Sequence, residues 1–351
     1  MKVARPSLRH SFNVHQLLRI PSAVGLSLIV SLLTPVTAAA SWGIVVGTGP
    51  TAIAVDPATG YSYAISNDWT LKTIGPAPSF QVMATATLTQ RPSDIAVATA
   101  YGKVYVAVPR SQLVAVFNTN GNPIGQIGMG RKSKPTFLAV DQTKGLLYVA
   151  NQQEKRIAIV DMATDAVLSR YAANVAADGF GFHPTLRRIY VSDIQSQTVQ
   201  AFDPDTGTQV GVVTVPSGAS LLFVDANRNR LYVSLPAVPA VAVLDASTLA
   251  VLTTLPTPTA PTGFALDALN DRLVVSYSGS STVGIWDANT LTELKRAAVG
   301  PSPAGCAWIP GTSTALVANS GSNTVTVIDT LVGAIVGVAS TLDRPASGTT
   351  F

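Results

Sequence analysis

The sequence has little cysteine: Cys306 is the only one in 351 residues. An intramolecular disulfide and a haem-attachment pair of cysteines are therefore both excluded. Cys306 lies in an apolar stretch, where a lone thiol is more often a small core residue than a nucleophile. The fold must therefore be held together by packing and strand pairing.

Histidine and glutamate are almost as scarce. Beyond residue 40 the chain has one histidine, His183, and two glutamates, Glu154 and Glu293. A histidine-rich metal site is excluded, and a Ser-His-Asp triad would have to use His183. No glycine-rich phosphate motif precedes a helical pattern. These shortages favour a protein that is not an enzyme.

Long apolar runs are confined to the N-terminus. The first 22 residues carry four basic side chains and no acidic one: Lys2, Arg5, Arg9 and Arg19. An apolar run follows over 23–33, and residues 38–40 are Ala-Ala-Ala. This order is typical of a secretory signal peptide, so we expect residues 1–40 to be removed after Ala40. The alternative is an uncleaved anchor, although the run is short for a bilayer span. Export would place the protein in the periplasm or outside the cell.

The chain also lacks an excess of charge of one sign once the predicted signal peptide, residues 1–40, is excluded. The full chain has 23 Lys and Arg against 19 Asp and Glu, and four of the basic residues lie in 1–40. The mature chain is therefore formally neutral. Its overall charge gives no support to nucleic-acid binding.

The sequence has a repeat instead. Residues 137–168 follow the order strand, Asp-led turn, strand, polar loop, strand, Asp-led turn, strand, which predicts a four-stranded antiparallel meander. The first turn recurs every 42 or 43 residues, at Asp56, Ala98, Asp141, His183, Asp225, Asp267 and Pro310. The second turn recurs with the same period, at Asn118, Asp161, Asp203, Asp245, Asp287 and Asp329. Such a period of four short strands is the signature of propeller blades.

We therefore predict an all-β fold, a seven-bladed β-propeller of four-stranded antiparallel blades over residues 41–342. Each blade has two apolar faces and can bury them only against its neighbours in a closed ring. A strand predicted at Trp42–Val46 precedes the first blade, so we expect this N-terminal strand to close the ring on the last blade. It would take the outer place there or add a fifth strand beside 334–339. Residues 343–351 are predicted to be a flexible C-terminal tail.

Two recurring residue types have structural explanations. A tyrosine recurs in the second strand of five blades: Tyr63, Tyr105, Tyr148, Tyr190 and Tyr232. This frequency indicates packing between blades rather than ligand stacking. The leading Asp residues are predicted to be turn formers, because an Asp side chain there bonds the backbone two residues on. His183 replaces Asp in one such turn, which indicates a surface turn residue.

Several strand sequences resemble one known family. The segments 148–151 (Tyr-Val-Ala-Asn), 190–193 (Tyr-Val-Ser-Asp) and 316–329, with Asn-Thr-Val-Thr-Val-Ile-Asp at its end, resemble repeats of the YVTN-type (YncE-like) seven-bladed β-propeller proteins. The resemblance covers nearly the whole mature chain. It implies the propeller fold, export, and a binding or accessory role. Related propellers include lactone-hydrolysing enzymes and quinoprotein partners, so the resemblance does not name a ligand.

The loops between second and third strands and the loops between blades should share one face of the ring. Around blades two and three these loops carry seven basic residues, here called the basic sector: Arg91, Arg110, Arg131, Lys132, Lys134, Lys155 and Arg156. Asp94 and Glu154 are the acids counted nearby, and the matching loops of blades five and six are uncharged. Positive charge is thus concentrated on one part of this face, which suits an anion-binding surface. The alternative is a solvated edge with scattered Lys and Arg.

Seven other cations are assigned to the opposite face, where Asp residues dilute them: Lys103, Lys144, Arg187, Arg188, Arg228, Arg230 and Arg272. We predict that this second group serves solubility only.

Three functions stay open. The favoured one is a monomeric, non-catalytic binding or scaffold protein that presents the basic sector and Trp69 to a partner protein or small anionic ligand, without a cofactor. The second is a lactonase-like hydrolase with a divalent metal near the axis, held by Glu154 with Asn151, Asp193 or Asn319. The third is single-stranded nucleic-acid binding, for which Trp69 and Tyr277 are the candidate stacking aromatics.

Overall fold

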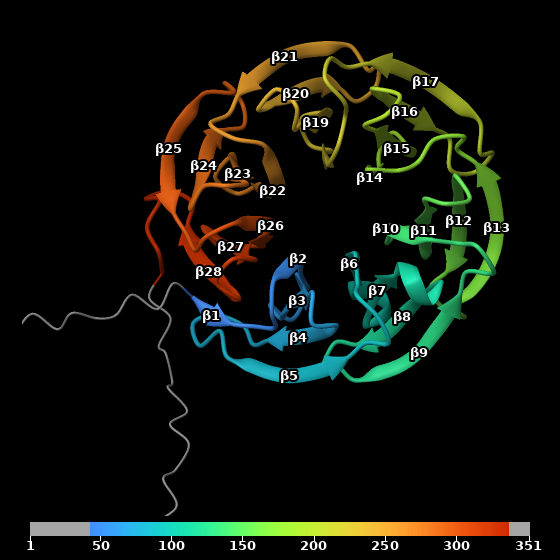
Figure 1. Ribbon diagram of the computed structural model, residues 1–351, viewed down its shortest axis with the longest axis horizontal. Helices are drawn as coiled ribbons and strands as arrows, with labels where there is room; N and C mark the ends of the chain where they lie inside the picture. Colours follow the sequence, from blue (N-terminus) through green and yellow to red (C-terminus); the bar gives the residue numbers. More distant parts are fainter. Residues whose placement is uncertain (1–42, 337–351) are drawn as a thin grey trace, which may run out of the picture. The chain divides into compact units, whose positions relative to one another are not determined.

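The protein is a seven-bladed ring of β-sheets. The computed structural model describes residues 43–336, so the predicted signal peptide (1–40) and C-terminal tail (343–351) lie outside the described residues. The described chain forms 28 strands and two short 3-10 turns. Its strands make seven four-stranded antiparallel sheets around a central axis (Figure 1). The predicted all-β, seven-bladed propeller is confirmed.

In the first six blades the strands follow chain order from the axis to the rim. Blade one contains β2 (Pro50–Val55), β3 (Ser62–Ser66), β4 (Thr70–Ile74) and β5 (Val82–Thr87). Blade two contains β6 (Asp94–Ala98), β7 (Lys103–Val108), β8 (Leu113–Asn118) and β9 (Pro123–Gly128). Blade three contains β10 (Pro135–Asp141), β11 (Leu146–Asn151), β12 (Arg156–Asp161) and β13 (Ala166–Ala172).

The remaining blades repeat this arrangement. Blade four contains β14 (Gly179–His183), β15 (Arg188–Asp193), β16 (Thr198–Phe202) and β17 (Gln209–Thr214). Blade five contains β18 (Leu222–Asp225), β19 (Arg230–Leu235), β20 (Ala240–Asp245) and β21 (Val251–Pro256). Blade six contains β22 (Pro261–Asp267), β23 (Arg272–Tyr277), β24 (Thr282–Asp287) and β25 (Glu293–Ala298). Blade seven contains β26 (Pro303–Ile309), β27 (Thr314–Asn319), β28 (Thr324–Asp329) and, at the rim, β1 (Ile44–Val45).

The N-terminal strand closes the ring, as predicted, and it takes the outer place of blade seven. Ile44 pairs with Val325 and Val45 with Thr324, at one end of β28. At the other end of β28, Ile335 forms an antiparallel bridge to Ile328. The rim of blade seven is therefore shared between two segments from opposite ends of the chain, and β1 does not add a fifth strand. The rest of the predicted 334–339 strand, beyond residue 336, lies outside the described residues.

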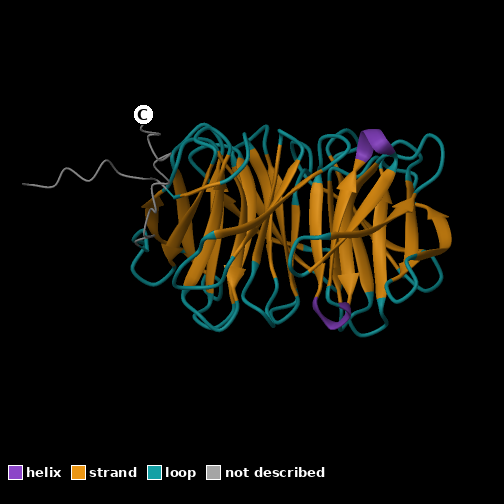
Figure 2. Ribbon diagram, turned by 90° about the horizontal axis from the view of Figure 1, so that it is seen from below, coloured by secondary structure: helices purple, strands orange, loops and turns teal. Residues whose placement is uncertain are grey.

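The ring has two faces with different connections. One face, here called the hairpin face, carries the turns from first to second and from third to fourth strands. The other, the loop face, carries the loops from second to third strands and the crossings between blades. The two 3-10 turns, η1 (Thr99–Tyr101) and η2 (Pro109–Ser111), occupy one connection of each kind and lie at opposite ends of the strands (Figure 2).

The hydrophobic core lies between blades. One cluster joins Ala107, Val114 and Met129 of blade two to Val149 and Val160 of blade three, and all five are at most 1% exposed. Burial of each such aliphatic side chain contributes about 1.5–3 kcal/mol. Because each cluster draws on two neighbouring blades, no blade holds a core of its own.

Hydrogen bonds also join each blade to the next. The Tyr63 hydroxyl donates to the Thr119 carbonyl at 2.6 Å, and Tyr190 makes the matching bond to Ala246 at 2.6 Å. The recurring tyrosines are fully buried, which confirms that they pack between blades. On the loop face the Ser93 hydroxyl donates to the Thr136 carbonyl of blade three at 2.8 Å. These contacts replace the disulfides that the sequence excludes.

The leading Asp residues are turn formers, as predicted. Asp141 Oδ1 accepts the backbone N–H groups of Thr143 at 3.0 Å and Lys144 at 3.1 Å. His183 does the same work with its ring, since Nδ1 accepts the Leu186 N–H at 3.2 Å. His183 is only 2% exposed, so the prediction of a surface residue is wrong. Burial lowers the pKa of His183, which keeps the accepting nitrogen unprotonated.

Cys306 lies in β26, the innermost strand of blade seven, and is buried. Burial raises the pKa of its thiol to about 12, so the thiolate is not populated near neutral pH. Cys306 packs in an apolar cluster with Ala265, Val283 and Val317. The prediction of a small core residue is confirmed.

Candidate anion-binding face

The structure places the whole basic sector on the loop face of two adjacent blades. Arg91 lies between β5 and β6, and Arg110 lies in η2 between β7 and β8. Arg131, Lys132 and Lys134 follow one another between β9 and β10. Lys155 and Arg156 lie at the start of β12. All seven side chains are exposed.

These cations are almost all without a protein partner. Lys134 Nζ donates to Gln152 Oε1 at 2.7 Å. Within residues 43–336, the side chains of the other six take part in none of the eight ion pairs and in none of the side-chain hydrogen bonds. An exposed cation of this kind keeps its full capacity to bind an external anion.

Short contacts connect the loops into one surface. The Trp69 carbonyl accepts the Leu88 N–H at 2.7 Å, and the hydroxyls of Thr89 and Ser111 lie 2.8 Å apart. The Gln112 carbonyl then accepts the Met129 N–H at 2.9 Å, one residue before the 130–134 loop. The loops of blades one, two and three therefore form a continuous surface. We call it the loop-face strip, running from Trp69 through Arg91, Arg110, Gln112, Arg131, Lys132, Lys134 and Gln153 to Arg156.

A depression lies within the strip. It has a volume of about 600 Å³ and is lined by Gln112, Arg131, Lys132 and Gln153. These four side chains come from three successive loops, between β7 and β8, between β9 and β10, and between β11 and β12. Two amides and two cations thus converge on one open hollow.

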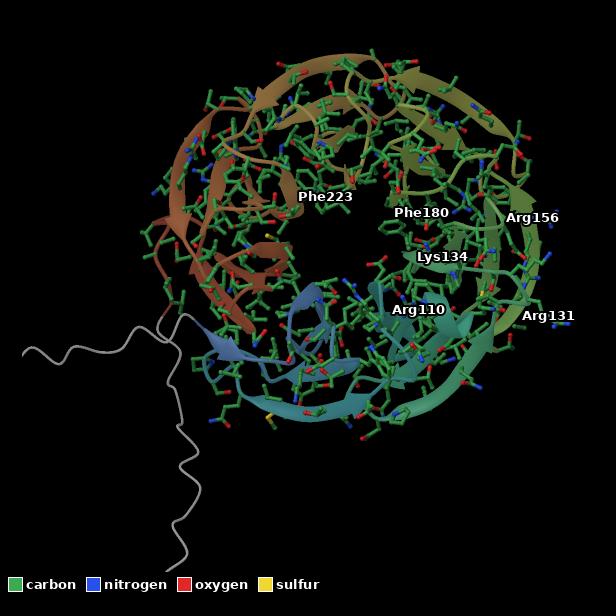
Figure 3. The ribbon with its side chains drawn as sticks, viewed as in Figure 1. Arg110, Arg131, Lys134, Arg156, Phe180 and Phe223 are labelled. Atoms are coloured by element: carbon green, nitrogen blue, oxygen red, sulfur yellow. The ribbon has the colours of Figure 1, made fainter. Side chains whose placement is uncertain are left out.

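The strip also spans the radius of the ring. Arg131 and Arg156 lie at the outer rim, whereas Arg110 and Lys134 lie nearer the axis (Figure 3). The inner strands also present aromatic rings toward the axis, with Phe180 of blade four and Phe223 of blade five bordering the centre (Figure 3). The Phe223 and Phe264 ring centroids are 6.4 Å apart.

The strip contains more acid than the sequence count allowed. Besides Asp94 and Glu154, the structure places Asp68, Asp178 and Asp193 on this face, so seven cations face five carboxylates and the local excess is two. Three of these acids already bind other segments of the fold: Asp68 accepts the Thr48 N–H at 2.7 Å, Asp178 the Ile194 N–H at 2.9 Å and Asp94 the Leu138 N–H at 2.8 Å. Asp68 and Asp178 could have been assigned to this face from the sequence, because both lie in loops of the kinds that form it.

Asp94 has an unusual environment. It is only partly exposed and is enclosed by atoms of blades two and three, and this burial raises its pKa to about 7 despite the hydrogen bonds from the Leu138 and Ile95 backbone. The carboxyl group is therefore partly protonated at neutral pH. Below pH 7 the Asp94 carboxyl is mostly neutral, so it offsets little of the positive charge of the basic sector.

Trp69 lies on the loop face, as predicted, and has a strained backbone. Its φ is +64°, and its side chain is 41% exposed. The same loop position has positive φ in other blades, where it holds Gln112, Lys155, Gln197 and Asn323. A bulky residue at positive φ is uncommon and costs on the order of 1 kcal/mol. Tyr277, the second candidate aromatic, is fully buried and its hydroxyl accepts the Trp286 Nε1–H at 3.0 Å, so it is not a stacking surface.

The candidate metal ligands do not come together. Asn151, Asp193 and Asn319 end the second strands of blades three, four and seven, and blade seven lies across the ring from the other two (Figure 1). Asn319 Nδ2 donates to Thr324 at 3.2 Å, and Asp193 Oδ1 accepts the Gln195 N–H at 2.8 Å. Glu154 and Asn151 share one loop, and the Asn151 amide is buried without a hydrogen-bond partner. Over the described range 43–336, no group of three or more His, Cys, Asp and Glu side chains could hold a metal ion.

Comparisons with known proteins show the fold and nothing narrower. No protein-family model and no curated protein matches the chain, so the YVTN-type resemblance is not confirmed. Among solved structures, a chain of Kuenenia stuttgartiensis hydrazine synthase is similar, with a TM-score of 0.69 and 18% sequence identity over 80% of this chain and 96% of that one. At this identity the likeness shows the propeller fold alone. No helix between residues 43 and 336 has the length and apolar character needed to cross a membrane.

Proposed function

We propose that the protein is an exported, non-catalytic binding propeller whose loop face takes an anionic partner. The observation that carries this proposal is the state of the cations. Six exposed Arg and Lys side chains of the basic sector have no partner among the described residues, whereas every other described cation bonds a carboxylate, carbonyl or hydroxyl oxygen. A cluster of unpaired cations does not stabilise the fold. A surface that binds anions, in contrast, requires cations that are not already paired.

The depression supports the same reading. Arg131 and Lys132 reach it from one loop, and Gln112 and Gln153 supply amides that can donate hydrogen bonds to the same anion. A planar guanidinium can hold a carboxylate, sulfate or phosphate with two parallel hydrogen bonds. The candidate metal ligands form no comparable arrangement, because Asn319 lies across the ring from the others and no group of three or more His, Cys, Asp and Glu among the described residues could hold a metal ion.

The proposal is tested with a charge-reversed variant on a sulfonate cation-exchange resin. The mature chain, residues 41–351, is expected to bind the resin at low salt although its formal net charge is zero. Arg131→Glu/Lys132→Glu/Lys134→Glu should elute at a clearly lower NaCl concentration with its melting temperature nearly unchanged. The control is Lys295→Glu/Arg296→Glu, which reverses two charges on β25 of blade six. Equal elution of the triple variant and the wild type would refute the proposed anion-binding face.

Export is a separate part of the proposal, supported by the basic, apolar and Ala-Ala-Ala order of residues 1–40. Sequencing the N-terminus of protein recovered from expressing cells should give Ser41 as the first residue. A protein that keeps its first 40 residues would contradict cleavage.

A further inference from the structure

We infer that the anionic partner is an acidic polysaccharide, a sugar chain with carboxylate or sulfate groups that lies along the loop-face strip and stacks one ring on Trp69. This inference rests on the proposed anion-binding function and adds the chemistry of the ligand. It is carried by three features: the strained and exposed indole, the amide-rich depression, and the length of the strip.

The indole is displayed at a cost. At the matching position blades two, three, four and seven use Gln112, Lys155, Gln197 and Asn323, and blade one alone puts an aromatic ring at positive φ in this loop. With 41% of its surface exposed, the ring also forgoes much of the burial that would stabilise the fold. The exposed face of an indole is apolar and electron-rich, so it attracts the weakly positive C–H groups on one face of a sugar ring.

The neighbouring side chains suit hydroxyls and anions together. Gln112 and Gln153 line the depression with Arg131 and Lys132, and the Ser111 hydroxyl is adjacent to Gln112. An amide both donates and accepts hydrogen bonds, as a sugar hydroxyl does, whereas a cation only donates. A ligand that carries hydroxyls and anionic groups in alternation would satisfy both kinds of side chain.

The extent of the strip favours a polymer over a small anion. Its cations reach from Arg110 and Lys134 near the axis to Arg131 and Arg156 at the rim (Figure 3). Its loops belong to three consecutive blades, and the Thr89–Ser111 contact and the Lys134–Gln152 hydrogen bond link one blade to the next. No single carboxylate or sulfate can contact the axis and the rim at once.

Single-stranded nucleic acid fits less well. Its sequence-tolerant binding depends on several aromatic rings interleaved with the cations. Of the two other aromatics that could serve, Tyr277 is buried and Tyr101 lies in η1 on the hairpin face. The strip therefore offers one stacking position, at its end.

The test measures affinity of the mature chain for polygalacturonate, heparin oligosaccharide, neutral dextran, poly-dT and poly-glutamate, at one fixed salt concentration. We expect binding to at least one of the two acidic polysaccharides, no binding to dextran, and weaker binding to poly-dT and poly-glutamate. Trp69→Asn should weaken polysaccharide binding about tenfold, while Trp69→Phe keeps a ring and most of the affinity. Asn suits positive φ, so this variant is expected to fold. Tyr101→Asn, which removes a 37% exposed ring from the hairpin face, is the matched control.

The outcomes separate the two proposals. Trp69→Asn should leave retention on the sulfonate resin unchanged, because it removes no charge. Retention of the wild type on sulfonate without affinity for either acidic polysaccharide would overturn the polysaccharide and leave the anion-binding face. Tighter binding to poly-dT or poly-glutamate, or a Trp69→Asn variant with wild-type affinity for the polysaccharide, would overturn it as well. A wild type that fails to bind sulfonate and both polysaccharides removes both proposals.

Discussion

The two faces of the ring use their cations in opposite ways. All seven cations of the hairpin face donate to a carboxylate, or to a backbone carbonyl of the next blade: Lys103, Lys144, Arg187, Arg188, Arg228, Arg230 and Arg272. On the loop face, none of the seven basic-sector cations makes such a contact among the described residues, and only Lys134 bonds another side chain, the Gln152 amide. The prediction that the hairpin face serves solubility only is therefore wrong, because six of these cations join neighbouring blades and Arg272 pairs within blade six. Under the proposed function, the loop-face cations are free to bind an external anion.

Arg187 shows how the hairpin face is built. Its guanidinium lies 2.6 Å from Asp141 of blade three and 2.8 Å from Asp205 of its own blade. Lys144 of blade three reaches the same Asp205 at 2.9 Å. The hydrogen bonds from Arg187 and Lys144 hold the pKa of Asp205 below its usual range. Two blades are thus joined through one shared carboxylate.

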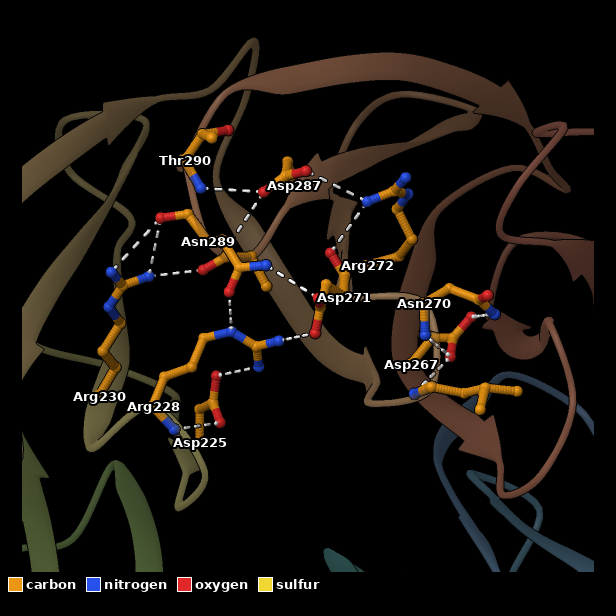
Figure 4. Close-up of polar contacts among 12 residues, drawn as sticks. Asp225, Arg228, Arg230, Asp267, Asn270, Asp271, Arg272, Asp287, Asn289 and Thr290 are labelled. Carbon is orange, nitrogen blue, oxygen red and sulfur yellow. Dashed lines mark hydrogen bonds and ion pairs between the residues drawn. The ribbon is translucent and has the colours of Figure 1, made fainter.

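A second network joins blades five and six in the same way (Figure 4). Arg228 pairs with the buried Asp225 at 2.9 Å and with Asp271 of blade six, and its Nε donates to Asn289 Oδ1 at 2.8 Å. Arg230 donates to the carbonyls of Ala288 and Asn289. Such networks are more resistant to salt than the exposed, unpaired cations of the loop face, because their charges are partly buried.

The largest difference between the faces should appear on truncating one arginine from each. Arg187→Ala leaves Asp141, which is 1% exposed, without its cation, and should lower the free energy of unfolding by about 3 kcal/mol. At the size of this protein that corresponds to a fall of about 4–5 °C in melting temperature. Arg131→Ala is the matched control and should stay within about 0.5 kcal/mol of the wild type. Equal losses in the two variants, measured by thermal unfolding, would contradict the division of roles.

A smaller effect separates the carboxylates of the two faces. Asp94 on the loop face has a folded pKa of about 7, above its unfolded value near 4, so its contribution to stability is fully present below about pH 4 and is lost as the pH rises through 7. Asp94→Asn keeps an oxygen that can accept the Leu138 N–H and removes the charge. The variant should therefore melt a few degrees above the wild type at pH 8, with a difference that shrinks toward pH 4.

Asp205 on the hairpin face should behave in the opposite way. Its folded pKa is lowered, so the stability it contributes is present above about pH 4 and is lost as the pH falls through its folded pKa. Asp205→Asn is therefore expected to lower the melting temperature at pH 8, where Asp94→Asn raises it. Shifts of the same sign for the two variants at pH 8 would show that this account of the two carboxylates is wrong.

The smallest expected effect concerns His183 on the hairpin face. Its pKa is lowered by burial, so the unfolded chain takes up a proton first as the pH falls below about 6.5, and the free energy of unfolding declines from there as the pH falls. His183→Asn retains an oxygen acceptor for the Leu186 N–H and cannot titrate. The difference in melting temperature between variant and wild type should therefore grow in favour of the variant from pH 7 to pH 5.5. A constant difference would show that His183 does not titrate in this range.

Much of the fold could be predicted because the period is long and regular. Two turn positions repeating every 42 or 43 residues assign every loop to one face, so Arg91, Arg110 and Lys155 could be placed together without a structure. The sequence repeat could not predict details of backbone geometry. The positive φ of Trp69 and the shared rim of blade seven, where β1 and Ile335 each pair with part of β28, depend on local turn geometry and on where two distant segments meet.

The chain's own pattern determined the number of blades, the order of strands within them and the face on which each charged residue lies, because apolar strands and Asp-led turns at a constant interval allow only a closed ring. Which of these charged side chains form ion pairs was decided by the tertiary structure alone. The partner of Arg187 is Asp141 on the preceding blade, 46 residues earlier, whereas Arg131 and Arg156 find no carboxylate within reach. Such pairing depends on where individual side chains lie at the contact between two blades. The sequence repeat predicts which blades are neighbours, but it does not predict which side chains pair between them.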